Sequence, residues 1–308
     1  MTVDTEVLPV NIALDKASDT GAKADDNYTA DATPTFTFSN IPADVATVTL
    51  TLNTGQHYTI DLSKGTTFTL PDELKDGTYT ATVTVTDVAG NSANSQLTFT
   101  IDTVVDKPAI ELVADSDSGD SQTDGLTNET KPQFQLSGVD IDDINTITIA
   151  IVGSDGSNKG SWTLDAETYG NGTWTCPVAL DDGQYTITVT VEDMAGNQST
   201  SDATAFEIDT VTHVDSIVLL DDTGSSTTDN QTNVNTPEFA INVPDDVTHV
   251  SIMIDGKAAG EASKQTDGTW HFSTAALADG AHTVSVTVTD EAGNTSCLLY
   301  TSPSPRDA

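Results

Sequence analysis

The chain has 308 residues, and its 48 acidic against 10 basic side chains give a formal net charge of −38. Such a chain has no basic patch that could neutralise nucleic-acid phosphates or an anionic membrane surface, so both classes of partner are excluded. It has no apolar run of about 18 residues and no signal-peptide pattern at its start, so we expect neither a membrane span nor a cleaved leader.

The first part of the chain alternates apolar and polar residues in short runs divided by turn residues, as expected of strands with one buried face. The predicted strands are 9–14, 33–38, 46–52, 57–62, 66–70, 78–87 and 95–102. Seven short strands in about 100 residues are typical of an immunoglobulin-like β-sandwich, so the predicted fold class is all-β. The predicted inward-facing residues are Phe36, Phe38, Val48, Leu50, Phe68, Tyr79, Val83, Val85 and Phe99.

A nine-residue stretch repeats along the chain: VTVTDVAGN at 83–91 returns as VTVEDMAGN at 189–197 and as VTVTDEAGN at 286–294. Each copy is a strand pattern that breaks into Asp, Gly and Asn, residues that favour a tight loop. Three other landmarks keep their spacing to it: the Asp-Thr pairs that begin at Asp4, Asp102 and Asp209, the acidic loops 19–26, 117–124 and 222–229, and the Asp-Gly pairs 76–77, 182–183 and 279–280. This self-similarity predicts three tandem domains, 1–101, 102–208 and 209–296, which together form an extended rod. The junctions have no Gly- or Ser-rich tether, so the last strand of each domain should run directly into the first strand of the next.

The end of the chain breaks the repeat, because CLLYTSPSPRDA stands where a seventh strand ending in Ile-Asp-Thr should follow. Residues 297–308 resemble the in-frame translation of a transposase-type sequencing adapter, so we expect a non-native tail and a third domain without its last strand. A natural Pro-rich terminus is the alternative. Of the two cysteines, Cys297 lies in this tail, and Cys176 stands at a core position, where a buried structural thiol is expected.

The sequence offers no pattern for catalysis. It contains no Gly-x-Ser-x-Gly elbow, no His-Glu-x-x-His motif and no Gly-rich phosphate loop. The five His share no repeat position, and the acidic pairs recur in every repeat, whereas a single active site would not. We therefore expect a protein without enzymatic activity.

The acidic residues instead indicate metal binding, because 38 of them are Asp and because Asp-rich loops supply the oxygen ligands that Ca²⁺ prefers. In an immunoglobulin-like sandwich, the loop between the last two strands shares one end with the entry to the first strand. The Asp that begins each domain should therefore lie beside the Asp and Asn of that domain's repeated loop, and the two Asp of each acidic loop should lie together at the opposite end. Carboxylates about 4 Å apart repel by roughly 4 kcal/mol per pair at an effective dielectric near 20, and a divalent cation reverses the sign. The predicted Ca²⁺ ligands are Asp4, Asp19, Asp26, Asp87 and Asn91 in the first repeat, Asp102, Asp117, Asp124, Asp193 and Asn197 in the second, and Asp209, Asp222, Asp229, Asp290 and Asn294 in the third.

Simple turn chemistry is the alternative for all of these positions, since Asp and Asn also bond to their own backbone in tight turns. For the Asp-Gly pairs at 76, 182 and 279 we favour turns. For Asn91, Asn197 and Asn294, a ligand role and a left-handed turn conformation are both open.

The order of these motifs carries a resemblance. Asp-Ser/Thr-Gly-x4-Asp, then Thr-x4-Pro, then Thr-Asp-x-Ala-Gly-Asn and Ile-Asp-Thr resemble the bacterial Ig-like repeats of giant type I-secreted adhesins, over residues 4–296. The resemblance implies tandem sandwiches with calcium at or near the junctions, in a biofilm or cell-surface protein. It also implies a spacer that holds a distal binding domain, which would contact a host or matrix glycan or protein. The sequence departs from the pattern at Glu192, which precedes the loop Asp of the second repeat.

Two other functions stay open. One is a glycan- or receptor-binding role for these domains themselves, for which Trp162 is the residue to test, because it is the Trp without a counterpart in the other repeats. The other is an accessory segment of a large secreted hydrolase. The expected partners within this chain are the neighbouring repeats, and the expected location is extracellular, at the bacterial surface.

Overall fold

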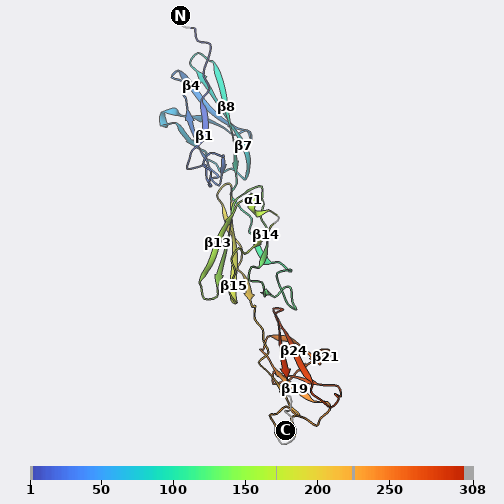
Figure 1. The fold of residues 1–308 in the computed structure, drawn as a ribbon. Coiled ribbons are helices and arrows are strands. Elements are labelled where there is room, and N and C mark those ends of the chain that lie inside the picture. The colour runs from blue at the N-terminus through green and yellow to red at the C-terminus, as the bar shows by residue number, and fades with distance from the viewer. Residues whose placement is uncertain (1–2, 171, 224–225, 302–308) are drawn as a thin grey trace.

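The structure is a computed structural model that describes residues 3–170, 172–223 and 226–301. Three β-sandwich domains follow one another in a row, and the two ends of the chain lie at opposite ends of an elongated molecule (Figure 1). The predicted all-β class and the tandem arrangement are both confirmed. No helix in the described ranges is long and apolar enough to cross a membrane.

Domain 1 packs a three-stranded sheet against a five-stranded one. The first sheet has the order β1 (Asn11–Leu14), β3 (Thr35–Ser39) and β6 (Thr67–Thr69), and the second β2 (Tyr28–Thr29), β8 (Ser92–Ile101), β7 (Gly77–Asp87), β4 (Val45–Leu52) and β5 (His57–Ile60), with a short 3-10 helix, η1 (Leu62–Lys64), after β5. The seven predicted strands correspond to β1 and β3 to β8. The two-residue strand β2, which pairs in parallel with β8, escaped prediction because it is too short to show alternation.

Domain 2 repeats this plan, but β12 and β13 are longer than β4 and β5, and the counterpart of β8 is divided into β16 and β17. One sheet has the order β14 (Thr173–Thr175), β11 (Gln133–Ser137) and β9 (Ala109–Leu112), and the other β10 (Leu126–Thr127), β17 (Thr204–Ile208), β15 (Gly183–Asp193), β12 (Ile144–Gly153) and β13 (Asn158–Leu164), with β16 (Gln198–Thr200) also on β15. The single-turn helix α1 (Ala166–Tyr169) follows β13. It begins after Asp165, whose carboxylate accepts the backbone N–H of Thr168 in a capping box.

Domain 3 packs two four-stranded sheets. Their orders are β18 (Ser216–Leu219), β19 (Glu238–Asn242), β23 (Trp270–Ser273) and β22 (Ser263–Lys264), and β21 (Lys257–Glu261), β20 (Val247–Ile254), β24 (Thr283–Asp290) and β25 (Thr295–Thr301). Strand β24 carries the third copy of the repeated stretch, as β7 and β15 carry the first two.

The expectation that domain 3 lacks its last strand is wrong for the part of the tail that the structure describes. Residues 295–301 form β25, which pairs antiparallel with β24 from Thr289↔Thr295 to Thr283↔Thr301. The run Cys-Leu-Leu-Tyr-Thr has the β-branched and aromatic character of a strand, and β24 would otherwise present an unpaired edge. Residues 302–308 lie outside the described residues, and the origin of the tail stays a prediction.

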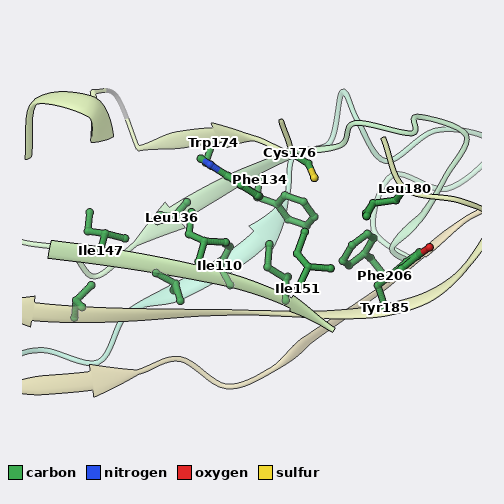
Figure 2. Packing of buried hydrophobic residues seen from close by; sticks show 14 of the residues in the cluster. Ile110, Phe134, Leu136, Ile147, Ile151, Trp174, Cys176, Leu180, Tyr185 and Phe206 are labelled. Atoms are coloured by element: carbon green, nitrogen blue, oxygen red, sulfur yellow. The ribbon is translucent and has the colours of Figure 1, made fainter. Parts of the chain in front are cut away.

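Each sandwich encloses its own core, and an aromatic pair bridges the two sheets. Figure 2 shows the core of domain 2, where Phe134 and Phe206 meet edge to face with ring centroids 5.1 Å apart. Phe36 and Phe99 make the same contact in domain 1, at 5.3 Å. Of the predicted inward set, all are buried except Phe68 and Tyr79, which are half-buried and pack against the core. Cys176 is fully buried in the core of domain 2, and burial raises the pKa of its thiol, as expected of a structural residue (Figure 2).

The domains are joined by short extended segments rather than by continuous strands. Strand β8 ends at Ile101 and β9 begins at Ala109, while β17 ends at Ile208 and β18 begins at Ser216. The prediction that one strand runs directly into the next is therefore wrong. Contacts that hold these connecting segments replace strand continuity, and they involve the residues of the candidate site.

Candidate metal centres

The repeated loop that follows β7, β15 and β24 is built around its Asp. In domain 2 the Asp193 carboxylate accepts the Asn197 backbone N–H at 2.8 Å and the Asn197 side-chain amide at 2.7 Å. Asp87 with Asn91 and Asp290 with Asn294 make the same two bonds. The intervening glycine, Gly196 in domain 2, has φ +92°, which a residue with a Cβ adopts only with strain. This glycine closes the turn, and the loop holds its Asp rigidly at the end of a long strand.

The Asn of each loop also holds the segment that enters the domain. The side-chain amide of Asn197 donates to the Asp102 carbonyl oxygen at 2.9 Å, and Asn294 donates to the Asp209 carbonyl at the same distance. The backbone N–H of Asp102 donates in turn to the Thr29 carbonyl of domain 1 at 2.9 Å. Asp102 is thus fixed by one domain through its N–H and by the next through its carbonyl. Asp209 is fixed in the same way between Thr127 and Asn294.

These contacts decide one of the open alternatives. Gly90, Gly196 and Gly293 supply the positive φ of the loops, and the loop asparagines are not among the described residues with positive φ. A left-handed turn role for Asn91, Asn197 and Asn294 is therefore wrong. Each bridges a carboxylate and a carbonyl, and whether any also contacts a cation stays a prediction.

A third carboxylate completes each site, and sequence reasoning missed it. Carboxylate oxygens of Asp102, Asp143 and Asp193 lie within 4.8 Å of one another, and the same holds for Asp4, Asp44 and Asp87 and for Asp209, Asp246 and Asp290. The third member stands directly before strand β4, β12 or β20, and its carbonyl accepts the backbone N–H of the residue after the loop Asp. The available signal was an Asp immediately before the first apolar residue of that strand. Its distance along the chain from the loop Asp is not constant, so a search for fixed spacing does not find it.

Burial and the crowding of like charges raise the pKa values of several of these carboxyl groups. Burial first, and then the charges of Asp102 and Asp193, raise the pKa of Asp143 to about 6. Burial is also the main cause of the raised pKa values of Asp102 and Asp209. For Asp87 burial acts in the same direction, but hydrogen bonds from Asn91, Gly90 and Ala89 outweigh it and lower the pKa. The clusters at the two domain junctions therefore hold carboxylates in proximity that is unfavourable without a counter-charge.

The donor set fits a hard divalent cation. Among the described residues, each of the three clusters is made of Asp carboxylates alone, without His or Cys. In domain 3 one carboxylate oxygen of Asp246, Oδ1, is buried without a hydrogen-bond partner from the described residues. An unpartnered buried oxygen in an all-oxygen site is chemically suited to Ca²⁺ and unsuited to Zn²⁺, which favours His and Cys.

The acidic loop at the opposite end of each domain holds a second, smaller group of carboxylates. Asp19 and Asp117 are buried, and Oδ1 of Asp19, Asp117 and Asp222 has no hydrogen-bond partner in the described part of the chain. Burial is the largest cause of the raised pKa of Asp19, and the charge of Asp26 adds to it. The second Asp of each pair accepts the backbone N–H two residues ahead, at 3.1 to 3.2 Å, as in an Asx turn. The structure thus brings Asp19 near Asp26 and Asp117 near Asp124, with the turn geometry also present.

The acidic loop of each of the first two domains touches the repeated loop of the next domain. The Thr20 hydroxyl donates to the Ala195 carbonyl, and the Ser118 hydroxyl donates to the Ala292 carbonyl, each at 2.5 Å. The glycines that follow lie against the same loops. A Cβ on Gly21 would be 2.2 Å from the Met194 carbonyl oxygen, and one on Gly119 would be 1.9 Å from that of Glu291. We call this pairing of a Thr/Ser-Gly loop with an Ala-Gly-Asn loop the domain joint.

The Asp-Gly pairs act next to the same joints. Asp76 accepts both the backbone N–H and the hydroxyl of Thr103, at 3.2 and 2.8 Å, and Asp182 accepts the hydroxyl of Thr210 at 2.8 Å. Asp76 and Asp182 therefore fasten the segments that leave domains 1 and 2, a role beyond the simple turn predicted from the sequence. Trp162 packs on Trp174 at a centroid distance of 5.1 Å and against the core, which gives it a structural role.

All three domains match one known protein family. The sequence pattern of the bacterial Ig-like domain matches residues 6–103, 104–210 and 211–299. No curated protein matches the chain.

Similar solved structures include a 1.5-MDa bacterial ice-binding adhesin studied for host cell surface retention, at 19% identity over 96% of this chain and 97% of that one, with a TM-score of 0.41. Another is a Ca²⁺-stabilised adhesin with which an Antarctic bacterium reaches out and binds ice, at 20% identity over 97% and 74%, with a TM-score of 0.36. A third is a tetra-tandem repeat from the extending region of a large adhesion protein, at 17% identity over 96% and 74%, with a TM-score of 0.29. These likenesses are too distant to add to the family match. That match recurs three times and accounts for nearly all of the sequence, so the chain belongs to the bacterial Ig-like domain family.

Proposed function

We propose that this chain is a non-catalytic spacer of a large secreted bacterial adhesin, and that Ca²⁺ stiffens it at the domain junctions. The observation that carries the proposal is the recurrence of one three-carboxylate cluster at the entry to every domain. At the two internal junctions, the first carboxylate of the cluster belongs to Asp102 or Asp209, whose backbone is bonded to both adjoining domains.

The position of the cluster explains how a bound cation would act at a domain junction. Asp102 belongs to the connecting segment, whereas Asp143 lies directly before β12 and Asp193 is the last residue of β15 in domain 2. A cation shared by these three carboxylates ties the segment that leaves domain 1 to the body of domain 2. Because the same cluster recurs at the next junction, the effect is additive along the chain and favours a straight rod, as expected of a spacer that holds a distal adhesive domain outside the cell.

The experiment is thermal unfolding followed by circular dichroism in EGTA and in millimolar Ca²⁺. A ligand that binds only the folded chain adds about 2.7 kcal/mol of stability at a hundredfold excess over its Kd, so the melting temperature should rise in Ca²⁺. Asp143→Asn and Asp246→Asn remove one carboxylate from each junction cluster and should reduce the rise. An unchanged melting temperature in the unsubstituted chain would rule out stabilisation by calcium.

Matched controls lie beside the substituted residues. Asp142 and Asp245 are exposed neighbours of Asp143 and Asp246 and lie outside the clusters. Asp142→Asn and Asp245→Asn change the net charge equally and should retain the full response to Ca²⁺. Small-angle scattering of the same samples reports stiffness: a rod of roughly 120 Å, from strands of about 33 Å per ten residues, is expected in Ca²⁺. A broader distribution of shapes is expected in EGTA, and equal scattering with and without Ca²⁺ would contradict junction stiffening.

A further inference from the structure

The preceding domain covers the repeated loop of domains 2 and 3, whereas the repeated loop of domain 1 is exposed. Ala195 and Ala292 are 0% exposed, because the Thr/Ser-Gly loop of the preceding domain covers them. Ala89, at the same position in domain 1, is exposed, and the adjacent Val88 is 76% exposed. The covering loop, and not the fold of the domain itself, therefore buries this alanine.

The backbone of the bare loop has the same shape as that of the covered ones. Gly90 has φ +94°, against +92° at Gly196 and +86° at Gly293. A Cβ on Gly196 would lie 2.9 Å from Gly21, and one on Gly293 would lie 3.0 Å from Gly119. Around Gly90, no atom of the described residues lies within 4 Å of such a Cβ. The Val88 N–H still bonds to the Asp44 carbonyl at 3.0 Å, so the loop is held in its docked form with its outer side free.

We propose that the Val88–Ala89–Gly90 loop is a docking site for the Thr/Ser-Gly loop of another bacterial Ig-like repeat. The two filled joints define what such a partner needs. It needs a hydroxyl that can donate to the Ala89 carbonyl, as Thr20 and Ser118 donate to Ala195 and Ala292. It also needs a glycine directly after that hydroxyl, because a side chain there would collide with the carbonyl of the residue at the Val88 position.

The partner is thereby distinguished from a generic protein surface. The pair Thr/Ser-Gly directly after the first Asp of the acidic loop occurs once in each repeat; Thr20–Gly21 and Ser118–Gly119 occupy joints, and Gly224 of the third pair lies outside the described residues. The contact consists of a hydroxyl–carbonyl bond and a close backbone approach, so it is selective for a small loop of that shape. Docking does not require calcium, since the hydroxyl–carbonyl bond and the glycine packing involve no carboxylate.

The test adds a repeat to the full chain and measures whether the loop becomes covered. In the extended chain, a copy of residues 104–208 stands directly before Asp4, so that Ile208 precedes Asp4 as Ile101 precedes Asp102. Ala89→Cys provides the reporter in a Cys297→Ser background, because the equivalent Ala195 and Ala292 are fully buried in the filled joints, Cys297 is exposed and Cys176 is buried. Modification by a maleimide is timed in the original and in the extended chain, in Ca²⁺ and in EGTA.

We expect modification at least about tenfold slower in the extended chain, since only the open joint exposes the thiol. Gly119→Ala in the added copy should restore the fast rate, whereas Gly156→Ala in that copy, at a turn glycine with φ +79° and no neighbour within 4 Å, should not. Equal rates in the original and extended chains would overturn the proposal. A second extended chain, with residues 4–101 as the added copy and Thr20–Gly21 as the docking loop, gives the same test should the first fail to fold. Slow modification in EGTA as well as in Ca²⁺ would show that docking stands even where the calcium proposal fails.

Discussion

Two glycines of the repeated loop provide a matched pair for testing the domain joint. Gly90 and Gly196 have φ +94° and +92° and the same place in the same motif. Gly196 lies against Gly21 of the preceding domain, whereas a Cβ on Gly90 would meet nothing within 4 Å in the described part of the chain. Gly196→Ala and Gly90→Ala therefore impose the same local backbone strain and differ in the contact between domains.

The expected effects of the two substitutions on stability and on the joint follow from this difference in contacts. A residue with a Cβ in the left-handed region costs about 1–2 kcal/mol, and this cost should lower the melting temperature of both variants alike. In Gly196→Ala the new methyl group would also lie 2.9 Å from the Cα and N of Gly21, which are backbone atoms and cannot rotate away. The joint must then open, which removes the bond from Thr20 to Ala195, worth about 0.5–1.5 kcal/mol. With the packing that is lost, the closed joint should be disfavoured roughly tenfold.

Distance measurement between spin labels follows the joint directly. Thr54→Cys and Ser154→Cys, on exposed turns of domains 1 and 2, carry the labels in the Cys297→Ser background. The distance distribution should be narrow in the unsubstituted chain and in Gly90→Ala, and broad in Gly196→Ala. Equal distributions in the two glycine variants would refute the inference that this contact orients the domains.

Two further predictions concern pH and the last strand. In EGTA, stability should increase as the pH falls from 7 to 5. Asp143, with a folded pKa of about 6 against an ordinary value of 3.8, binds its proton more tightly when folded, so its ionisation costs stability above that pH. With allowance for solvent screening, the gain in the free energy of unfolding is about 1 kcal/mol, and Asp143→Asn should abolish it. Ca²⁺ should reverse the trend, because protons compete with the ion for the carboxylates. Thermal melts at each pH, in EGTA and in Ca²⁺, measure both effects. Deletion of residues 297–308 should destabilise domain 3, because β25 covers the edge of β24 and the ring of Tyr300 packs against that of Phe239, with centroids 6.0 Å apart. Tyr300→Ala alone should cost about 1–2 kcal/mol in urea unfolding. An unchanged unfolding midpoint would show that β25 adds nothing to stability.

The sequence predicts most of the fold because alternation and burial coincide in these strands. The alternation predicts that Val83 and Val85 point inward and the neighbouring threonines outward, and in the structure the two valines are buried and the threonines half-buried. Three copies of the pattern also locate the loop Asp in each domain. What escaped prediction has no periodic signal: β2 and β10 have two residues each, and Asp143 is positioned by a loop of variable length.

The joint could not be predicted for a different reason. Thr20 and Ala195 are 175 residues apart and belong to different domains. Their contact depends on how two folded units meet, which no local pattern encodes. The sequence did contain an indirect signal, since a Thr/Ser-Gly pair and an Ala-Gly-Asn triplet recur at every repeat, but it did not indicate that the two touch. The last strand was not predicted either, because a tail without the repeat's motif still pairs when an open strand edge is available.

The carboxylate cluster and the joint share one loop, and this has an energetic consequence. Asp193, which belongs to the cluster, and Ala195, which accepts the bond from Thr20, lie two residues apart in a turn closed by Asn197. Any ligand that orders the Asp193 carboxylate also orders the surface on which Gly21 rests. If calcium binds, closure of the joint must therefore tighten calcium binding by the same factor by which calcium favours closure. Gly196→Ala should then weaken calcium binding at the first junction although it removes no carboxylate, while the cluster of Asp209, Asp246 and Asp290 at the second junction keeps its affinity.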